Sequence, residues 1–66
     1  MAKEKIGSLK VYDDKGKAHL FEVFRAHGYN VELDGSVILA GTTHSTALAF
    51  MGSEAERRGW TRRATA

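Results

Sequence analysis

The chain has 66 residues, a net charge of +2 and no cysteine, so disulfides and cysteine-based zinc or redox sites are excluded. A domain of this size buries only about 60% of the surface that its unfolded chain exposes, and small domains usually need a further source of stability. With disulfides excluded, we expect a homodimer. No apolar run approaches the ~18 residues of a membrane span, and the first residues lack the apolar centre of a secretory signal. We therefore expect a cytoplasmic protein without membrane contact.

The chain opens with a predicted strand over residues 6–12. Leu9 and Val11 share one face of this strand, and polar residues occupy most of the other. The polar run 13–17 contains a glycine that can take a positive φ, and it predicts a turn.

Residues 18–27 admit two interpretations. As the second strand of a hairpin, the segment would place Leu20, Glu22 and Phe24 on one face, which is a poor alternation. At about 100° per residue, its side chains form a single helical stripe instead, made of Leu20, Val23, Phe24 and His27. Gly28 follows as a residue able to end a helix. We favour a helix here.

Residues 29–40 carry the clearest pattern, that of a β-hairpin. Asp34-Gly35 supplies the two residues of a type I′ turn, in which both φ angles are positive. Pairing outward from this turn places an apolar set on one face, namely Tyr29, Val31, Leu33, Ile38 and Ala40. Val37 and Leu39 fall on the second face, so we expect that face to be covered by other side chains or by a second subunit.

The segment 41–60 is predicted to be helical. Residues 43–45 can cap its start, and a narrow core stripe follows, made of Ala47, Leu48, Met51 and Ala55. Gly52-Ser53 interrupts this stripe, so one continuous helix and two helices with a kink both remain open. Gly59 predicts the C-terminal end of the helix.

Together these segments predict a small α+β domain with the element order β-α-β-β-α. Its antiparallel sheet would have helices packed on one face. One domain spans residues 1–66, and residues 1–5 and 61–66 are predicted to be flexible basic tails.

The sequence supports neither a metal site nor an enzyme. His19 and His27 would lie about 80° apart on a helix, and His44 belongs to another element. Ser45 directly follows His44, and adjacent helical residues diverge by about 100°, so the two cannot form a nucleophile–base pair. We expect no catalytic residue, no metal and no cofactor.

A group of hydroxyls near the start of the second predicted helix is a candidate anion site. Free backbone N–H groups and hydroxyls would meet there at the positive end of the helix dipole. The candidate residues are Thr42, Thr43 and Ser45. The alternative is that they only cap the helix.

Five residues are the predicted contacts with a partner protein: Phe50, Arg57, Trp60, Val37 and Leu39. Phe50 lies outside the predicted core stripe and beside Arg57, and an aromatic residue next to an arginine is typical of interfaces. Trp60 precedes further arginines. The alternatives are that Phe50 extends the core and that Trp60 folds back on its own helix.

Charge is distributed unevenly along the chain. Residues 1–17 sum to +2, residues 18–56 to −4 and residues 57–66 to +4. Basic ends predict an alternative function as a nucleic-acid-binding accessory or regulatory protein, with Phe50 or Trp60 stacking on bases. The phosphate-binding candidates would be Lys3, Lys5, Arg57, Arg58, Arg62 and Arg63. Because the body is acidic, we favour a non-enzymatic protein-interaction module, either a homodimer or an inhibitor or modulator of a partner protein.

Overall fold

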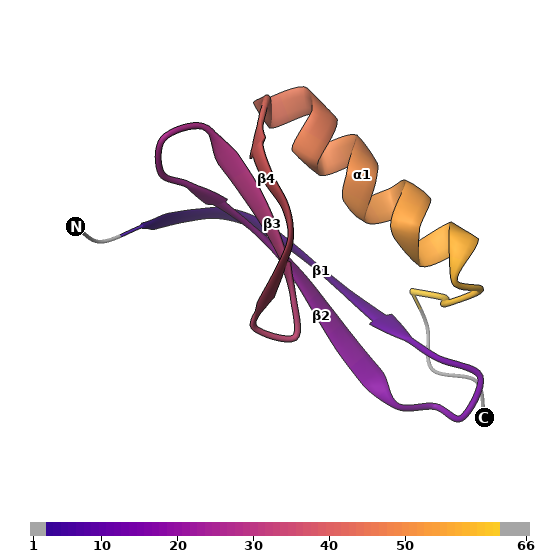
Figure 1. The fold of residues 1–66 in the computed structure, drawn as a ribbon. Helices are drawn as coiled ribbons and strands as arrows, with labels where there is room; N and C mark the ends of the chain where they lie inside the picture. The colour runs from indigo at the N-terminus through magenta and orange to yellow at the C-terminus, as the bar shows by residue number, and fades with distance from the viewer. Residues whose placement is uncertain (1–2, 63–66) are drawn as a thin grey trace.

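The computed structural model describes residues 3–62 as four strands followed by one helix (Figure 1). The elements in chain order are β1 (Glu4–Tyr12), β2 (Ala18–Arg25), β3 (Tyr29–Leu33), β4 (Ser36–Thr42) and α1 (His44–Arg57). The strands form one antiparallel sheet in the order β1-β2-β3-β4, and α1 crosses one face of that sheet. The predicted α+β class is confirmed. The order β-α-β-β-α is wrong, because a strand stands in place of the first helix.

The prediction of a helix over residues 18–27 is therefore wrong. The segment forms β2, which pairs with β1 on one side and β3 on the other. Phe21 and Val23 point towards α1 and are fully buried. Leu20 and Phe24 point to the opposite face. Apolar residues on both faces imitate a helical stripe, and two ladders of interstrand hydrogen bonds outweigh that local pattern.

The residues predicted to end that helix form the β2–β3 turn instead. His27 and Gly28 have φ angles of 52° and 98°. A Cβ on Gly28 would lie 3.4 Å from the Cα of Gly41, so the turn needs glycine for space as well as for its backbone conformation. The helix prediction required His27 to pack at the end of a core stripe. His27 is exposed instead.

The β3–β4 hairpin confirms the predicted turn but not the whole register. Asp34 and Gly35 both have positive φ, 51° and 87°. A bulge then shifts the pairing by one residue, so Val31 lies opposite Leu39 and not opposite Ile38. A shift of one residue moves a side chain to the other face of the sheet. Leu39 therefore packs against the core, which corrects its predicted place beside Val37.

Helix α1 is continuous through Gly52-Ser53, so the kink does not form. Thr43 caps its start, and the Oγ1 of Thr43 accepts a hydrogen bond from the backbone N–H of Thr46 at 3.2 Å. At the other end Gly59 has a φ of 75°. The N–H of Trp60 donates to the carbonyl of Ala55 at 2.9 Å, and this bond ends the helix as the sequence predicts.

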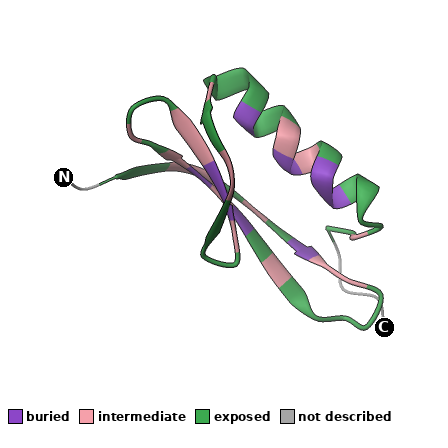
Figure 2. Cartoon of the chain, viewed as in Figure 1, coloured by how far each residue is buried: buried purple, intermediate pink, exposed green. Residues whose placement is uncertain are grey.

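The core lies between α1 and one face of the sheet (Figure 2). The sheet contributes the four largest fully buried side chains, and the helix contributes three further buried positions: Val11, Phe21, Val23 and Val31, then Ala47, Met51 and Ala55. Leu48, predicted in the helical core stripe, is 40% exposed. It leans towards Gly7 of β1, where a Cβ would lie 3.6 Å from its Cδ2.

Parts of both predicted tails belong to the fold. Glu4 and Lys5 lie in β1, which begins before the predicted strand. Thr61 pairs with Tyr12 as an isolated bridge, with N–H···O distances of 2.7 and 2.9 Å. Arg63 lies outside the residues that the structure describes. Within residues 3–62, no helix is long and apolar enough to cross a membrane.

Candidate interaction surfaces

The face of the sheet turned away from α1 is not covered by another described element (Figure 1). We call it the open face. Strand alternation places four apolar or aromatic side chains on it, Tyr12, Leu20, Phe24 and Val37. Val37 is 55% exposed and Leu20 is 36% exposed. Of the two second-face residues predicted from the hairpin, only Val37 therefore lies on the open face.

Two lysines and two glutamates form ion pairs across the open face. Glu22 and Glu32 lie directly opposite each other on β2 and β3, an arrangement that is unfavourable without nearby cations. Lys5 Nζ lies 3.2 Å from Glu22, and Lys3 pairs with Glu32, whose side chain is only 8% exposed. Lys3 and Lys5, predicted as a free basic tail, thus neutralise acids on the sheet.

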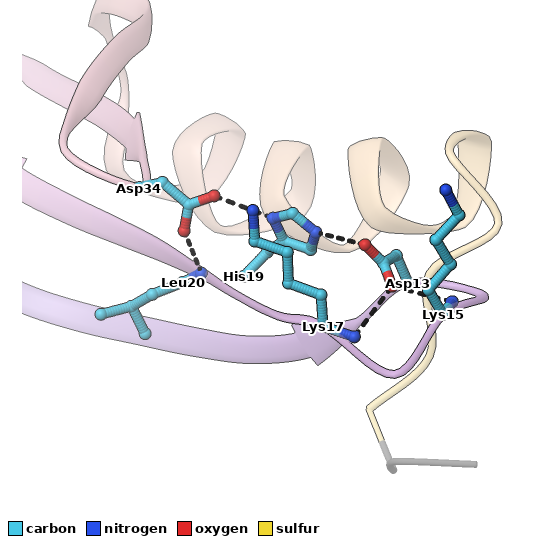
Figure 3. A network of polar contacts seen from close by, with 6 residues as sticks. All are labelled: Asp13, Lys15, Lys17, His19, Leu20 and Asp34. Atoms are coloured by element: carbon cyan, nitrogen blue, oxygen red, sulfur yellow. Dashed lines mark hydrogen bonds and ion pairs between the residues drawn. The ribbon is translucent and has the colours of Figure 1, made fainter.

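At the turn end of the sheet, a histidine joins two aspartates from different turns (Figure 3). His19 Nδ1 lies 2.8 Å from an Oδ2 of Asp34, and its Nε2 lies 3.0 Å from an Oδ2 of Asp13. Each aspartate is itself fixed by the backbone. Asp34 accepts the N–H of Leu20, and Asp13 accepts the N–H groups of two residues of its own turn, both at 2.9 Å. The imidazole therefore ties the β1–β2 turn to the β3–β4 turn.

Trp60 covers this histidine from the C-terminal side. The two rings are parallel within 3°, with centroids 4.0 Å apart. The guanidinium group of Arg58 also lies over the Trp60 ring, 5.1 Å from the ring centroid. Trp60 also meets Phe21 at 6.1 Å, so it joins the His19 cluster to the core. The alternative interpretation of the sequence was that Trp60 folds back on its own helix. Trp60 does fold back, but it packs on side chains of the sheet.

These contacts shift the ionisation of all three charged groups. The hydrogen bonds that His19 donates to Asp13 and then to Asp34 raise the pKa of His19 above its usual value of 6.5. In return, the hydrogen bond from His19 is the main cause that lowers the pKa of Asp13 and of Asp34 below 3.8. A protonated imidazole between two carboxylates is therefore the favoured state in the folded chain.

Stability should depend on pH through this cluster. Because the pKa of His19 is raised on folding, its contribution is complete below pH 6.5 and is lost as the pH rises through the folded value. The lowered pKa values of the aspartates act in the opposite direction, so their contribution is lost only as the pH falls below 3.8. Melting temperatures measured from acid to alkaline pH should be highest between these limits. Lys17 and Arg58 are the other charged groups nearby.

The variant His19→Gln should lose the fall in melting temperature above pH 6.5. His27→Gln is the matched control, since it removes an exposed imidazole from the β2–β3 turn, and it should keep the wild-type profile. An unchanged profile in His19→Gln would show that the cluster does not control the pH dependence.

The predicted Phe50–Arg57 contact surface is organised around a buried glutamate. Arg57 Nε donates to Glu54 at 3.1 Å and Arg58 Nε donates to it at 2.8 Å, and these two bonds, Arg57 first, lower the pKa of the Glu54 carboxyl. Glu54 itself is only 7% exposed. Phe50 is partly buried and packs against the core, which agrees with the alternative that Phe50 extends the core. Both arginines are therefore already paired within the chain.

The predicted anion site at the start of α1 is occupied by the helix cap. Thr43 Oγ1 accepts from the backbone of Thr46 and also donates to the Thr46 hydroxyl at 2.8 Å. Thr42 ends β4 opposite Tyr29, and Ser45 is exposed in the first turn. The three residues are neighbours in space, and capping accounts for the hydroxyl of Thr43.

A cavity of about 430 Å³ opens between β1 and the C-terminal half of α1. Its apolar walls are Leu9, Val11, Ala55 and Trp60, and its polar rim includes Glu56 and Arg62. Arg62, predicted to bind phosphate, thus borders a groove with Glu56 on the same rim. Among residues 3–62 no group of three or more His, Asp or Glu side chains could hold a metal ion.

Sequence reasoning missed the His19–Asp13–Asp34 cluster and its stack on Trp60. The cluster depends on β2 being a strand, because pairing with β1 on one edge and with β3 on the other brings Asp13 and Asp34 to the two ring nitrogens of His19. The available signal was that both aspartates begin a turn next to β2. Comparison with protein families, curated proteins and solved structures finds no significant match to this chain.

Proposed function

We propose that this protein is a non-enzymatic protein-interaction module that acts as a homodimer, with the open face as the subunit interface. The observation that carries the proposal is the exposure of Leu20 and Val37 on a sheet whose other face is covered by α1. Sheets with one bare apolar face gain stability when that face is buried against a second layer.

The small size of the core supports a second copy as the occupant. The buried core is made of seven side chains, three of which are alanine or methionine. The two largest dimensions of the molecule, 40 and 20 Å, limit a broad face to about 800 Å², which is the area that each partner buries in an interface of standard size. A dimer of standard size would therefore use most of the open face.

The charge pattern of the open face suits contact between identical copies. Lys5 and Lys10 lie on β1, whereas Glu22 and Glu32 lie on β2 and β3. In a two-fold interface the same surface meets itself, so Lys10 of one copy, which forms no ion pair with a carboxylate among residues 3–62, can approach the ion-paired glutamates of the other. Complementary charge of this kind favours one orientation over others.

The nucleic-acid alternative has less support. Lys3 and Lys5 are paired with glutamates on the open face, and Arg57 and Arg58 share Glu54. Contact with phosphate would have to replace these ion pairs. Among residues 3–62, Lys10, Lys15, Lys17 and Arg62 remain as cations outside such ion pairs, which is a small basic surface for a polyanion.

Sedimentation velocity across a concentration series tests the homodimer. Replacing Val37 with lysine should weaken dimerisation roughly tenfold to a hundredfold, because it removes one buried apolar side chain and adds a charge. Ala49→Lys, on the exposed side of α1, is the matched control and should leave dimerisation unchanged. A wild-type chain that stays monomeric at high concentration contradicts the proposal.

A further inference from the structure

Among residues 3–62, the outer edge of β1 has backbone groups without a strand partner at Ser8 and Lys10. The Tyr12 N–H and carbonyl point away from β2, because both bond to Thr61. Since antiparallel ladders alternate, the backbone groups of Ser8 and Lys10 point the same way. No backbone hydrogen bond in the described region reaches those two residues from the outer side. The Thr61 bridge shows that this edge accepts an antiparallel neighbour.

The 430 Å³ cavity lies directly beside this edge. Leu9 and Val11 line it from the strand, while Ala55 and Trp60 line it from α1 and the segment after it. A residue placed opposite Leu9 in an added strand shares the face of Leu9, so its side chain enters the cavity. Its neighbours in the added strand, opposite Ser8 and Lys10, point to the other side of the sheet.

Gly52 keeps the cavity open. It lies inside α1, where glycine costs about 1 kcal/mol relative to alanine. A Cβ built on it would have no heavy atom within 4 Å, so close packing does not require glycine there. The space that the missing side chain leaves is part of the cavity wall. A glycine that weakens the helix without a packing reason indicates that the space has a use.

We propose that the groove between β1 and α1 binds an extended peptide segment of a partner protein, in which apolar residues alternate with acidic ones. The segment adds to the outer edge of β1 as a fifth strand, and one apolar side chain fills the cavity. The acidic positions follow from charge, because they point to the face of the sheet that carries Lys10. The cavity side takes the apolar residues, since its rim holds Glu56 as well as Arg62. Neither cation has a carboxylate partner within residues 3–62.

The groove and the proposed dimer interface share Lys10 but are otherwise separate. The groove uses the edge of β1 and the helix, whereas the proposed homodimer uses Leu20 and Val37 on the open face. Peptide capture would give the module a second partner and a means to modulate that protein, and it does not require dimerisation.

Fluorescence anisotropy tests the proposal with the full 66-residue chain and a labelled eight-residue peptide in which Leu alternates with Asp. Gly52→Leu fills the cavity from the helix side and should weaken binding roughly tenfold to a hundredfold. Ala49→Leu adds the same bulk on the exposed side of α1 and should bind as the wild type does. Circular dichroism of both variants shows whether they keep the fold, and sedimentation of Gly52→Leu should match the wild type.

Two changes in the peptide test the same groove without altering the protein. N-methylation of the peptide nitrogens that face β1 should abolish binding, since it removes the donors of the added strand. Replacing Asp with Lys should weaken binding, because it opposes Lys10. In nuclear magnetic resonance spectra, the amides of Ser8 and Lys10 should become protected from exchange on binding. Absence of saturation at about 1 mM peptide, or equal binding by Gly52→Leu or by the methylated peptide, overturns the proposal.

Discussion

Phe21→Ala is expected to lower the free energy of unfolding by about 3 to 5 kcal/mol. Phe21 is the largest fully buried side chain, and it lies between Leu9 and Leu33 on neighbouring strands. Its ring also contacts Trp60. The loss combines the transfer of an aromatic ring to water with the cavity that it leaves, since a small core has few side chains able to relax into the gap.

A single core of this size supplies roughly 3 to 5 kcal/mol, so the variant should be largely unfolded at 25 °C. Urea denaturation followed by circular dichroism measures the loss. Phe24→Ala is the matched control, because it removes the same ring from the open face of the same strand, where the side chain is only partly buried. Equal destabilisation by the two substitutions would contradict the assignment of the core to the helix side of β2.

Trp60→Ala should cost about 2 kcal/mol of stability and reduce the pH dependence of the melting temperature. The substitution removes the ring stacked on His19 and one wall of the groove. An aromatic face favours the protonated imidazole, so its loss should bring the pKa of His19 closer to the usual value. The bonds to Asp13 and Asp34 remain, so part of the pH dependence should persist.

Trp60→Phe is the control for this second effect. It keeps an aromatic ring over His19 but has a smaller surface, so it should retain more of both the stability and the pH dependence than alanine does. Thermal unfolding at acid and alkaline pH separates the two contributions. If Trp60→Ala changed stability equally at every pH, the stack would act only through packing and not through the charge of His19.

The parts of the fold that depend on local chemistry were predictable from the sequence. Asp34-Gly35 specifies a two-residue turn, Thr43 provides a hydroxyl cap, and Gly59 ends the helix with a positive φ. Each of these features is decided by a few adjacent residues. The sequence around Gly52 was compatible with a continuous helix and with a broken one. Packing of Met51 and Ala55 on the sheet keeps the helix continuous.

The parts that depend on distant neighbours were not predictable in the same way. Residues 18–25 become a strand because they gain partners on both edges, which no local pattern reveals. The bulge that turns Leu39 inward is likewise set by how the sheet packs under α1. The candidate site was not predictable for the same reason, because the stack of His19 on Trp60 joins β2 to the distant segment after the helix. Arg57 and Arg58 were recognised as basic, but their shared partner Glu54 was not identified from the sequence.

The meander order of the strands also determines the sequence of events during folding. Each strand pairs with the strand next to it in the chain, so most interstrand contacts close short loops and we expect rapid folding. The bridge of Thr61 to Tyr12 and the stack of Trp60 on His19 join the last described residues to the first hairpin. These contacts close the longest loop and should form after the transition state. Weakening them should therefore accelerate unfolding while leaving the folding rate nearly unchanged.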